Sequence, residues 1–188
     1  MKRPHHAAAR RLTASGVRHS TERTATNAPS PTPQDWSAVW PFFRRVIAAG
    51  ETFTYPTDLT SDTARDWWLL DAPNRTVVAV DEAAGTVLGT AKMNNNQWGN
   101  GGHVASASFL VDPDHAGRGT GRALCVEALR WAREQGFRAM QFNAVVASNA
   151  PAVGLYRSLG FTVVGTVPEG FHHPRHGYVD LYVMHRPL

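Results

Sequence analysis

Apolar residues in this chain follow two different periods, and the points where the period changes mark the expected secondary structure. A period near 3.6 residues indicates an amphipathic helix, whereas strict alternation indicates a strand with one buried face. Helices are expected over four segments: 32–50, 61–70, 118–135 and 150–159. Strands are expected over six segments: 75–81, 86–93, 103–111, 138–146, 161–167 and 177–184.

The first expected helix has recognisable start and stop signals. Thr32 is a hydroxyl N-cap, Pro33 suits the first turn, and Asp35 places an acid there. Pro41 is expected to kink this helix and Gly50 to end it. Its apolar positions are Trp36, Val39, Trp40, Phe43 and Ile47. The third helix gathers its apolar residues on one face in the same way: Leu124, Cys125, Ala128, Leu129 and Ala132.

The order of these elements predicts an α/β (α+β) fold. Segments 75–81 and 86–93 flank the turn DEAAG and are expected to pair as a hairpin. Strand–helix–strand units follow, and a second hairpin comes last. This order is typical of a mixed central sheet with helices on both faces, in three layers.

Residues 1–33 differ in composition from the rest of the chain. They lack apolar periodicity and end in APSPTP, so we expect a disordered tail before a folded domain over residues 34–188. The chain carries a net charge of +4, but the tail holds six basic residues against one acidic residue, a net of +5. The remaining residues hold 13 basic and 14 acidic side chains, a net of −1. A basic arm could contact nucleic acid, but a solvated extension that is dispensable for folding explains the same composition, and no nucleic-acid partner is expected.

Chain length, apolar runs and cysteine content limit the class of protein to which this chain can belong. A chain of 188 residues suits one domain, and no apolar run is long enough to predict a membrane span. The basic first residues are not followed by the apolar stretch of a secretory signal. Cys125 is the only cysteine, so no intrachain disulfide can form, and a cytoplasmic location is predicted. No metal site is predicted.

The segment FLVDPDHAGRGTGRALCVEAL carries the clearest functional signal. Gly117, Gly119 and Gly121 lead directly from a strand into a helix. Glycines let backbone N–H groups approach a ligand, and the helix N-terminus adds a positive dipole end. The segment can therefore seat a pyrophosphate.

Three classes of phosphate-containing ligand bind to loops of this kind. A Walker loop requires a lysine that this segment lacks, and a dinucleotide fingerprint requires glycine where Arg122 stands. The pyrophosphate of an acyl-CoA remains. A glycine-rich turn without any ligand is the alternative, although Arg118 and Arg122 would add cationic donors for phosphate.

With the residues that follow, this loop resembles the GNAT acetyltransferase superfamily, whose signature is Q/R-x-x-G-x-G/A between a strand and a helix. FNAVVASNAPAVGLYRSLGF resembles the second motif of that superfamily. More narrowly, HVASASFLV, FNAVVASN, VGTVPEGF and YVD are similar to the branch containing the yeast acetyltransferase of proline analogues such as azetidine-2-carboxylate. The resemblance covers roughly residues 50–188. It departs at Ala116, in the Q/R position, and at Ser106, where that branch has an asparagine that holds the acceptor.

The resemblance implies a set of cofactor-binding and catalytic residues. A backbone N–H of Phe109, Leu110 or Val111 would polarise the thioester carbonyl. Tyr156 would protonate the leaving thiolate, and Asn149, which also suits a helix N-cap, would lie beside the reacting centre. The pyrophosphate would be held by five residues: Arg118, Gly119, Thr120, Gly121 and Arg122.

The acceptor site and the general base are less well defined. The residues expected to contact the acceptor are Asn143, Ser106, His103, Phe171 and His173. Met140, Phe142 and Ala144 should alternate to one face of their strand, leaving Gln141 and Asn143 on the other. Segment 169–178 is expected to form a lid. No carboxylate lies in residues 103–111, so the candidates for the base are His103, Glu169, His172, His173 and Asp180, or water.

The predicted function is transfer of acetyl from acetyl-CoA to the amine of a small molecule, such as an amino acid, an imino acid or a toxic analogue. A peptide or protein N-terminus is the alternative acceptor. A non-catalytic acyl-CoA-binding module is the alternative of a different class. A closed lid over a small site would favour a small acceptor, and an open groove would favour a peptide. A homodimer is compatible with the sequence.

Overall fold

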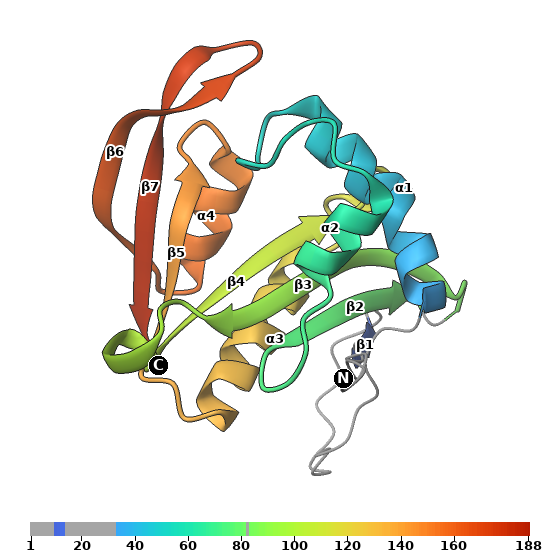
Figure 1. Ribbon diagram of the computed structural model, residues 1–188, viewed down its shortest axis with the longest axis horizontal. Coiled ribbons are helices and arrows are strands. Elements are labelled where there is room, and N and C mark those ends of the chain that lie inside the picture. Colours follow the sequence, from blue (N-terminus) through green and yellow to red (C-terminus); the bar gives the residue numbers. More distant parts are fainter. Residues whose placement is uncertain (1–9, 14–32, 82) are drawn as a thin grey trace, which may run out of the picture.

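A seven-stranded mixed sheet runs through the middle of the protein (Figure 1). The computed structural model describes residues 10–13, 33–81 and 83–188. The strands are β1 (Arg10–Thr13), β2 (Arg75–Asp81), β3 (Thr86–Asn95), β4 (Val104–Val111), β5 (Ala139–Val146), β6 (Thr162–His173) and β7 (Gly177–Pro187). They lie in the order β1-β2-β3-β4-β5-β7-β6. The β1–β2 and β4–β5 pairs are parallel and the others antiparallel.

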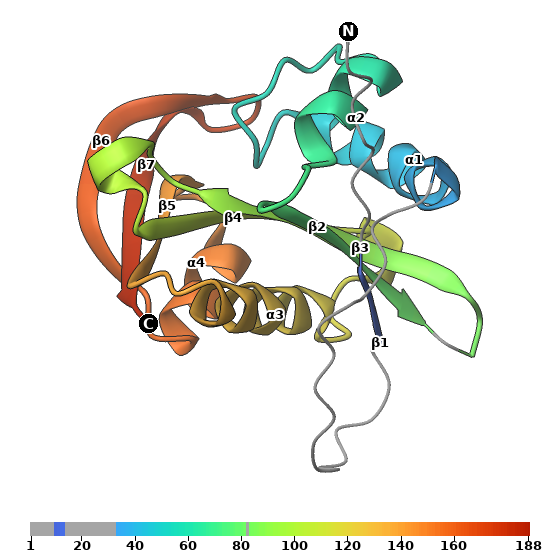
Figure 2. The same cartoon turned by 60° about the horizontal axis from the view of Figure 1, so that its bottom comes forward.

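Helices cover both faces of this sheet, which confirms the predicted three layers (Figure 2). The helices are α1 (Pro33–Ala49), α2 (Ser61–Trp68), α3 (Thr120–Glu134) and α4 (Ala150–Ser158), with short 3₁₀ turns η1 (Gly99–Gly101) and η2 (Pro113–His115). α1 and α2 lie on one face, and α3 and α4 on the other. α1 continues through Pro41 as one helix, and its expected cap, Thr32, lies outside the described residues.

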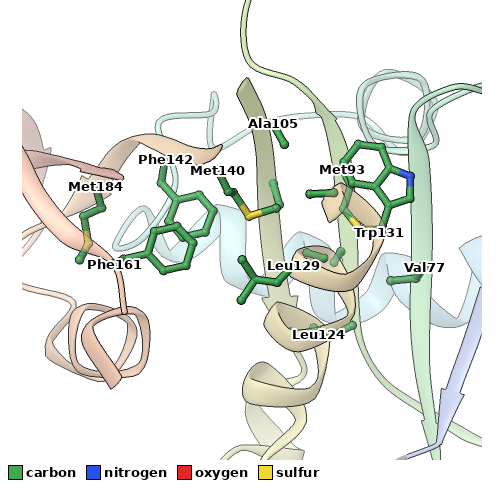
Figure 3. Close-up of a cluster of buried hydrophobic side chains, with 14 of the residues drawn as sticks. Val77, Met93, Ala105, Leu124, Leu129, Trp131, Met140, Phe142, Phe161 and Met184 are labelled. Atoms are coloured by element: carbon green, nitrogen blue, oxygen red, sulfur yellow. The ribbon is translucent and has the colours of Figure 1, made fainter. Parts of the chain in front are cut away.

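Each face of the sheet has its own apolar core, because successive strand residues point to opposite faces. On β2, Val77 and Ala79 pack in the core under α3, whereas Val78 and Val80 pack in the core under α1 and α2. Figure 3 shows the α3 side, where Leu124 and Leu129 face the sheet. The predicted apolar faces of the first and third helices are confirmed as buried, apart from Trp40, which is half-buried.

The sheet divides between β4 and β5. These parallel strands pair only at Val104↔Ala139 and Ala105↔Met140. Beyond that point β4 stays with β3 as far as Val111, while β5 stays with β7 as far as Val146. Figure 1 shows the two strands running apart from a common root. The result is an open split between two halves of one sheet.

Three sequence-based expectations are corrected by this arrangement. Arg10–Thr13 form β1 and pair with β2, so the tail is not uniformly without regular structure; residues 1–9 and 14–32 lie outside the described part of the chain. Segment 169–178 is no separate lid, because β6 and β7 continue through it as a hairpin. Ala144 does not share a face with Phe142, because the β5–β7 register shifts between Phe142 and Val145 and leaves Ala144 exposed.

Candidate active site at the split in the sheet

A cavity of about 540 Å³ occupies the split between β4 and β5. Two of its walls are the strands themselves, a third is α4, and the fourth is the connection between α1 and α2. The lining residues are 106–111 of β4, 142–146 of β5, 52–55 of the α1–α2 connection, and Val46, Ala116, Asn149, Ala152 and Tyr156. Their side chains are apolar, hydroxylic or amide groups, so the lining carries no charge at neutral pH.

The backbone of β4 presents hydrogen-bonding groups to this cavity. The Asp112 N–H bonds Leu88 O, and the Asn96 N–H bonds Val104 O, so even-numbered residues of β4 direct their backbone toward β3. The register with β3 continues without a shift from Ala105 to Val111. Because backbone groups alternate in direction along a strand, Phe109 and Val111 direct their N–H groups into the split. Leu110 directs its N–H toward β3 instead.

Tyr156 lies on α4 at the floor of the split, within an aromatic cluster. Its ring centroid lies 4.7 Å from that of Phe142 on β5 and 6.1 Å from that of Phe109 on β4. Burial, with a smaller contribution from the Cys125 thiol, raises the pKa of Tyr156 far above its ordinary value. The phenol therefore stays protonated at neutral pH, so it can donate a hydrogen bond or a proton but cannot act as a phenolate base.

Asn149 both caps α4 and lines the cavity. Its Oδ1 accepts a hydrogen bond of 3.2 Å from the Ala152 N–H, which confirms the predicted N-cap. The cap holds the start of α4 against the end of β5. Tyr156, two turns later on the same helix, is thereby placed over the same cavity.

The glycine loop has the conformation that an anion site requires. Gly117 has φ of 77° and Gly119 has φ of 81°, a region that favours glycine, and nothing lies within 4 Å of a Cβ built at either position. Gly119 is the N-cap of α3, with no side chain to satisfy the first N–H groups of that helix. Among the described buried side chains, Thr120 Oγ1 has no hydrogen-bond partner. An open cradle at a helix N-terminus with unsatisfied donors fits a pyrophosphate.

An ion-pair network fixes the segment between β4 and this loop. Arg45 of α1 contacts Asp112 Oδ1 at 2.7 Å and Asp114 Oδ2 at 2.9 Å. Asp112 also accepts a bond of 3.1 Å from the Asp114 N–H and lies 3.1 Å from His115 Nδ1. The network ties the exit of β4 to α1, so the glycine loop is held relative to the wall of the cavity that α1 provides.

The structure brings together only some of the residues predicted to contact the acceptor. Ser106 and Asn143 line the cavity. His103 lies at the opposite end of β4, beside a second cavity of about 370 Å³. Phe171 packs against Val146 and Leu181, and His173 is buried within the hairpin, where its Nδ1 accepts from the Arg175 N–H.

The candidate bases also lie outside the lining of the cavity. The Asp180 carboxylate accepts a hydrogen bond of 3.0 Å from the Glu169 N–H, and His172 lies against the ring of Tyr178. Cys125 is buried, and burial raises the pKa of its thiol, with Arg122 opposing the shift, so its prediction as a core residue is confirmed. Within the described ranges, no cluster of three or more His, Cys, Asp or Glu side chains could hold a metal ion. No helix in the described part has the length and apolar character of a membrane span.

Sequence reasoning missed the wall formed by the α1–α2 connection. Thr52, Phe53, Thr54 and Tyr55 line the cavity, although they follow the end of a helix and carry no motif. The only signal was the presence of two aromatic residues in the short polar stretch ETFTYPTD. It also missed Arg45, whose partners lie more than 60 residues later in the sequence.

The comparison with known proteins agrees with this geometry. The model of the acetyltransferase (GNAT) family matches residues 40–161. The chain belongs to the GNAT acetyltransferase family. Its fold is that of a solved GCN5-related N-acetyltransferase from Kribbella flavida, with 57% identity and a TM-score of 0.80 over 84% of this chain and 94% of that one.

Two curated relatives extend this comparison. The N-acetyltransferase aca1 of Schizosaccharomyces pombe is 29% identical over 156 residues, which cover 76% of this chain and 75% of that protein. The L-amino acid N-acyltransferase MnaT of Escherichia coli is 33% identical over 93 residues, which cover 49% of this chain and 54% of that protein.

Acetyl-CoA is the acetyl donor of this GNAT family, so the chain is an acetyl-CoA-dependent acetyltransferase. The residues present fit this donor. The glycine cradle suits the pyrophosphate, and the uncharged split, which begins beside Ala116 at the loop, suits the thioester arm.

Gly119→Val should lower the affinity for acetyl-CoA by about tenfold or more, because the branched side chain would fill the cradle. Strain at the αL position should separately lower the stability of the fold by about 1–2 kcal/mol. Gly136→Val is the matched control. Gly136 has φ of 77°, lies just beyond the other end of α3, and also has nothing within 4 Å of a built Cβ. Calorimetry on the two folded variants separates strain from blockage. Equal acetyl-CoA affinities would show that the loop does not hold the pyrophosphate.

Proposed function

We propose that this enzyme transfers the acetyl group of acetyl-CoA to the amine of a small molecule, such as an amino acid, an imino acid or a toxic analogue of one. One observation carries the proposal. A single cavity connects the glycine-loop end of the split with an uncharged polar region at Ser106, Ser108 and Asn143. The acetyl donor and the acceptor amine can therefore meet between β4 and β5, near Tyr156.

The surroundings of that region limit the size of the acceptor. Arg175, at the tip of the β6–β7 hairpin, contacts Glu51 of the α1–α2 connection at 2.7 Å. This contact joins the hairpin to the connection that contains the cavity wall at residues 52–55. It therefore supports an enclosed acceptor site rather than an open groove for a peptide. The name of the Escherichia coli relative, an L-amino acid N-acyltransferase, supports the same acceptor class.

The proposed roles follow from where each group lies. Acetyl-CoA supplies an activated acetyl thioester. The N–H groups of Phe109 and Val111 would donate hydrogen bonds to the thioester oxygen and stabilise the negative charge that develops on it. Tyr156 would donate its proton to the departing sulfur, and Asn149 would hold the neighbouring part of the donor while it caps α4. A tyrosine and a capping asparagine on the cavity wall favour an enzyme over a non-catalytic acyl-CoA-binding module.

The acceptor amine must reach the reacting centre without its extra proton. Burial in an uncharged cavity disfavours an ammonium ion, because no carboxylate lining the cavity compensates for the lost water. The lining therefore favours the free amine, and water can carry the proton away. A cytoplasmic location and a homodimer stay predictions from the sequence.

Thiol release from acetyl-CoA, measured with panels of acceptors, tests the proposal directly. The panels are proteinogenic amino acids, proline analogues and amine antibiotics, against short peptides with free N-termini. We expect at least one free amino or imino acid to be acetylated with a higher kcat/KM than any peptide. Activity confined to peptides would contradict the proposal and support the N-terminal alternative. Acetyl-CoA binding with no acceptor used would support the binding module.

Tyr156→Phe should lower turnover by about 10²–10⁴-fold, because a positioned proton donor stabilises only the transition state. Acetyl-CoA affinity should change little, since the phenylalanine ring keeps its place among Phe109, Phe142 and Phe161. Because the pKa of Tyr156 is raised, wild-type activity should not fall through tyrosine ionisation as the pH rises toward its ordinary value near 10.

Steady-state kinetics and calorimetry on the Tyr156→Phe variant check this expectation, with a pre-steady-state run to expose chemistry hidden behind product release. A chemical step within about twofold of the wild type would remove Tyr156 as the acid.

A further inference from the structure

A chain of three side-chain amides crosses the root of the split. Gln141 Nε2 donates to Asn143 Oδ1 at 2.8 Å, and Asn143 Nδ2 donates to Asn96 Oδ1 at 2.6 Å. Gln141 and Asn143 are alternate residues of β5, so they lie on the same face of the sheet. We call these three residues the amide bridge.

The amide bridge begins where the strand ladder stops. The last β4–β5 pair is Ala105↔Met140, and Gln141 is the next residue of β5. Asn96 follows β3, and its N–H donates to Val104 O at 2.7 Å, which anchors its backbone to β4. Since β4 lies between β3 and β5, the Asn96 side chain reaches across β4 to bond Asn143.

The exposure of the bridge indicates what it can contribute. Both hydrogen bonds are exposed to solvent, where water competes with them, so they add little to the stability of the fold. Their stronger effect is on the orientation of the Asn143 side-chain amide. An asparagine amide presents two N–H donors at one end and an acceptor oxygen at the other, and the two ends exchange places when the side chain rotates. With one donor and one lone pair engaged, the remaining N–H and lone pair of Asn143 keep fixed directions.

We propose that Asn96 and Gln141 are positioning residues, which hold the Asn143 amide in one orientation toward the acceptor in the cavity. The inference rests on the proposed function, because Asn143 lines that cavity and neither Asn96 nor Gln141 does. An acceptor that binds Asn143 then meets a preset N–H and a preset oxygen. If either Asn96 or Gln141 no longer bonds Asn143, the Asn143 amide can rotate, and each acceptor that binds must first fix its orientation.

Two substitutions with the same change in charge test the direction of the bridge. Asn96→Asp keeps an oxygen that accepts from Asn143 Nδ2, whereas Gln141→Glu replaces the donor to Asn143 Oδ1 with a second acceptor. We expect Gln141→Glu to raise the acceptor KM about tenfold and Asn96→Asp to keep it within about threefold of the wild type. For both variants, kcat should change less than KM, and the acetyl-CoA Kd should stay unchanged.

Asn96→Ala removes the far end of the bridge without adding charge. It should also raise the acceptor KM about tenfold. Asn95→Ala is the matched control, because Asn95 is its neighbour and bonds Gln97 O instead of Asn143. In ¹⁵N spectra, the side-chain amide signals of Asn143 should move in Asn96→Ala and stay in place in Asn95→Ala.

The outcomes distinguish failure of the proposed function from failure of the positioning role. A wild type that acetylates no small amine contradicts the proposed function and this inference with it. A wild type that does so, with equal acceptor KM values in all four variants, contradicts the positioning role alone. Equal increases for Asn96→Asp and Gln141→Glu, with none for Asn96→Ala, would show a general effect of charge and would also overturn it.

Discussion

The separation of β4 from β5 after two residue pairs is the constraint on which the rest of this site depends. A parallel pair that stayed together would satisfy its backbone groups internally and leave no space between the strands. Each strand here has a partner on its other side, β3 for β4 and β7 for β5, so the sheet survives the loss of the central pairing. The aromatic cluster of Phe109, Phe142 and Tyr156 fills the space on the α4 side of the split.

The functional groups gather at this split because the topology brings them there. β4 and β5 are parallel, so their carboxyl ends lie at the same edge of the sheet, and the loops that follow both strands meet there. The loop after β4 contains the glycine cradle, and the one after β5 contains Asn149 and leads into the helix of Tyr156. Arg45 ties the first of these loops to α1 through Asp112 and Asp114, so the start of the glycine loop is held beside the helix that leads into residues 52–55 of the cavity wall. The amide bridge lies at the other end of the split, next to the last β4–β5 residue pair.

The sequence predicted those features of the fold and site that depend on local patterns. Apolar periodicity located the four helices and six of the strands, and the glycine loop with SNAPAVGLYRSLGF located the end of the cavity at which we propose that the donor binds. What it could not predict depends on strand pairing. His103 directly precedes β4 and Ser106 lies three residues further along the chain, within that strand. Only Ser106 lines the cavity, since β4 and β5 are still paired at Val104 and Ala105, beside His103. Phe171 and His173 were assigned to a lid because nothing in HHPRHG distinguishes a mobile loop from the tip of a long hairpin.

Amide hydrogen exchange along β4, with and without acetyl-CoA, tests whether the sheet is split between β4 and β5. If the sheet is split, the N–H groups of Phe109 and Val111 face the cavity, and those of Ser108 and Leu110 bond β3. We predict that Phe109 and Val111 exchange at least about tenfold faster than Ser108 and Leu110 in the free protein, and become protected when acetyl-CoA binds. Equal protection of all four in the free protein, or no response of Phe109 and Val111 to acetyl-CoA, would contradict it.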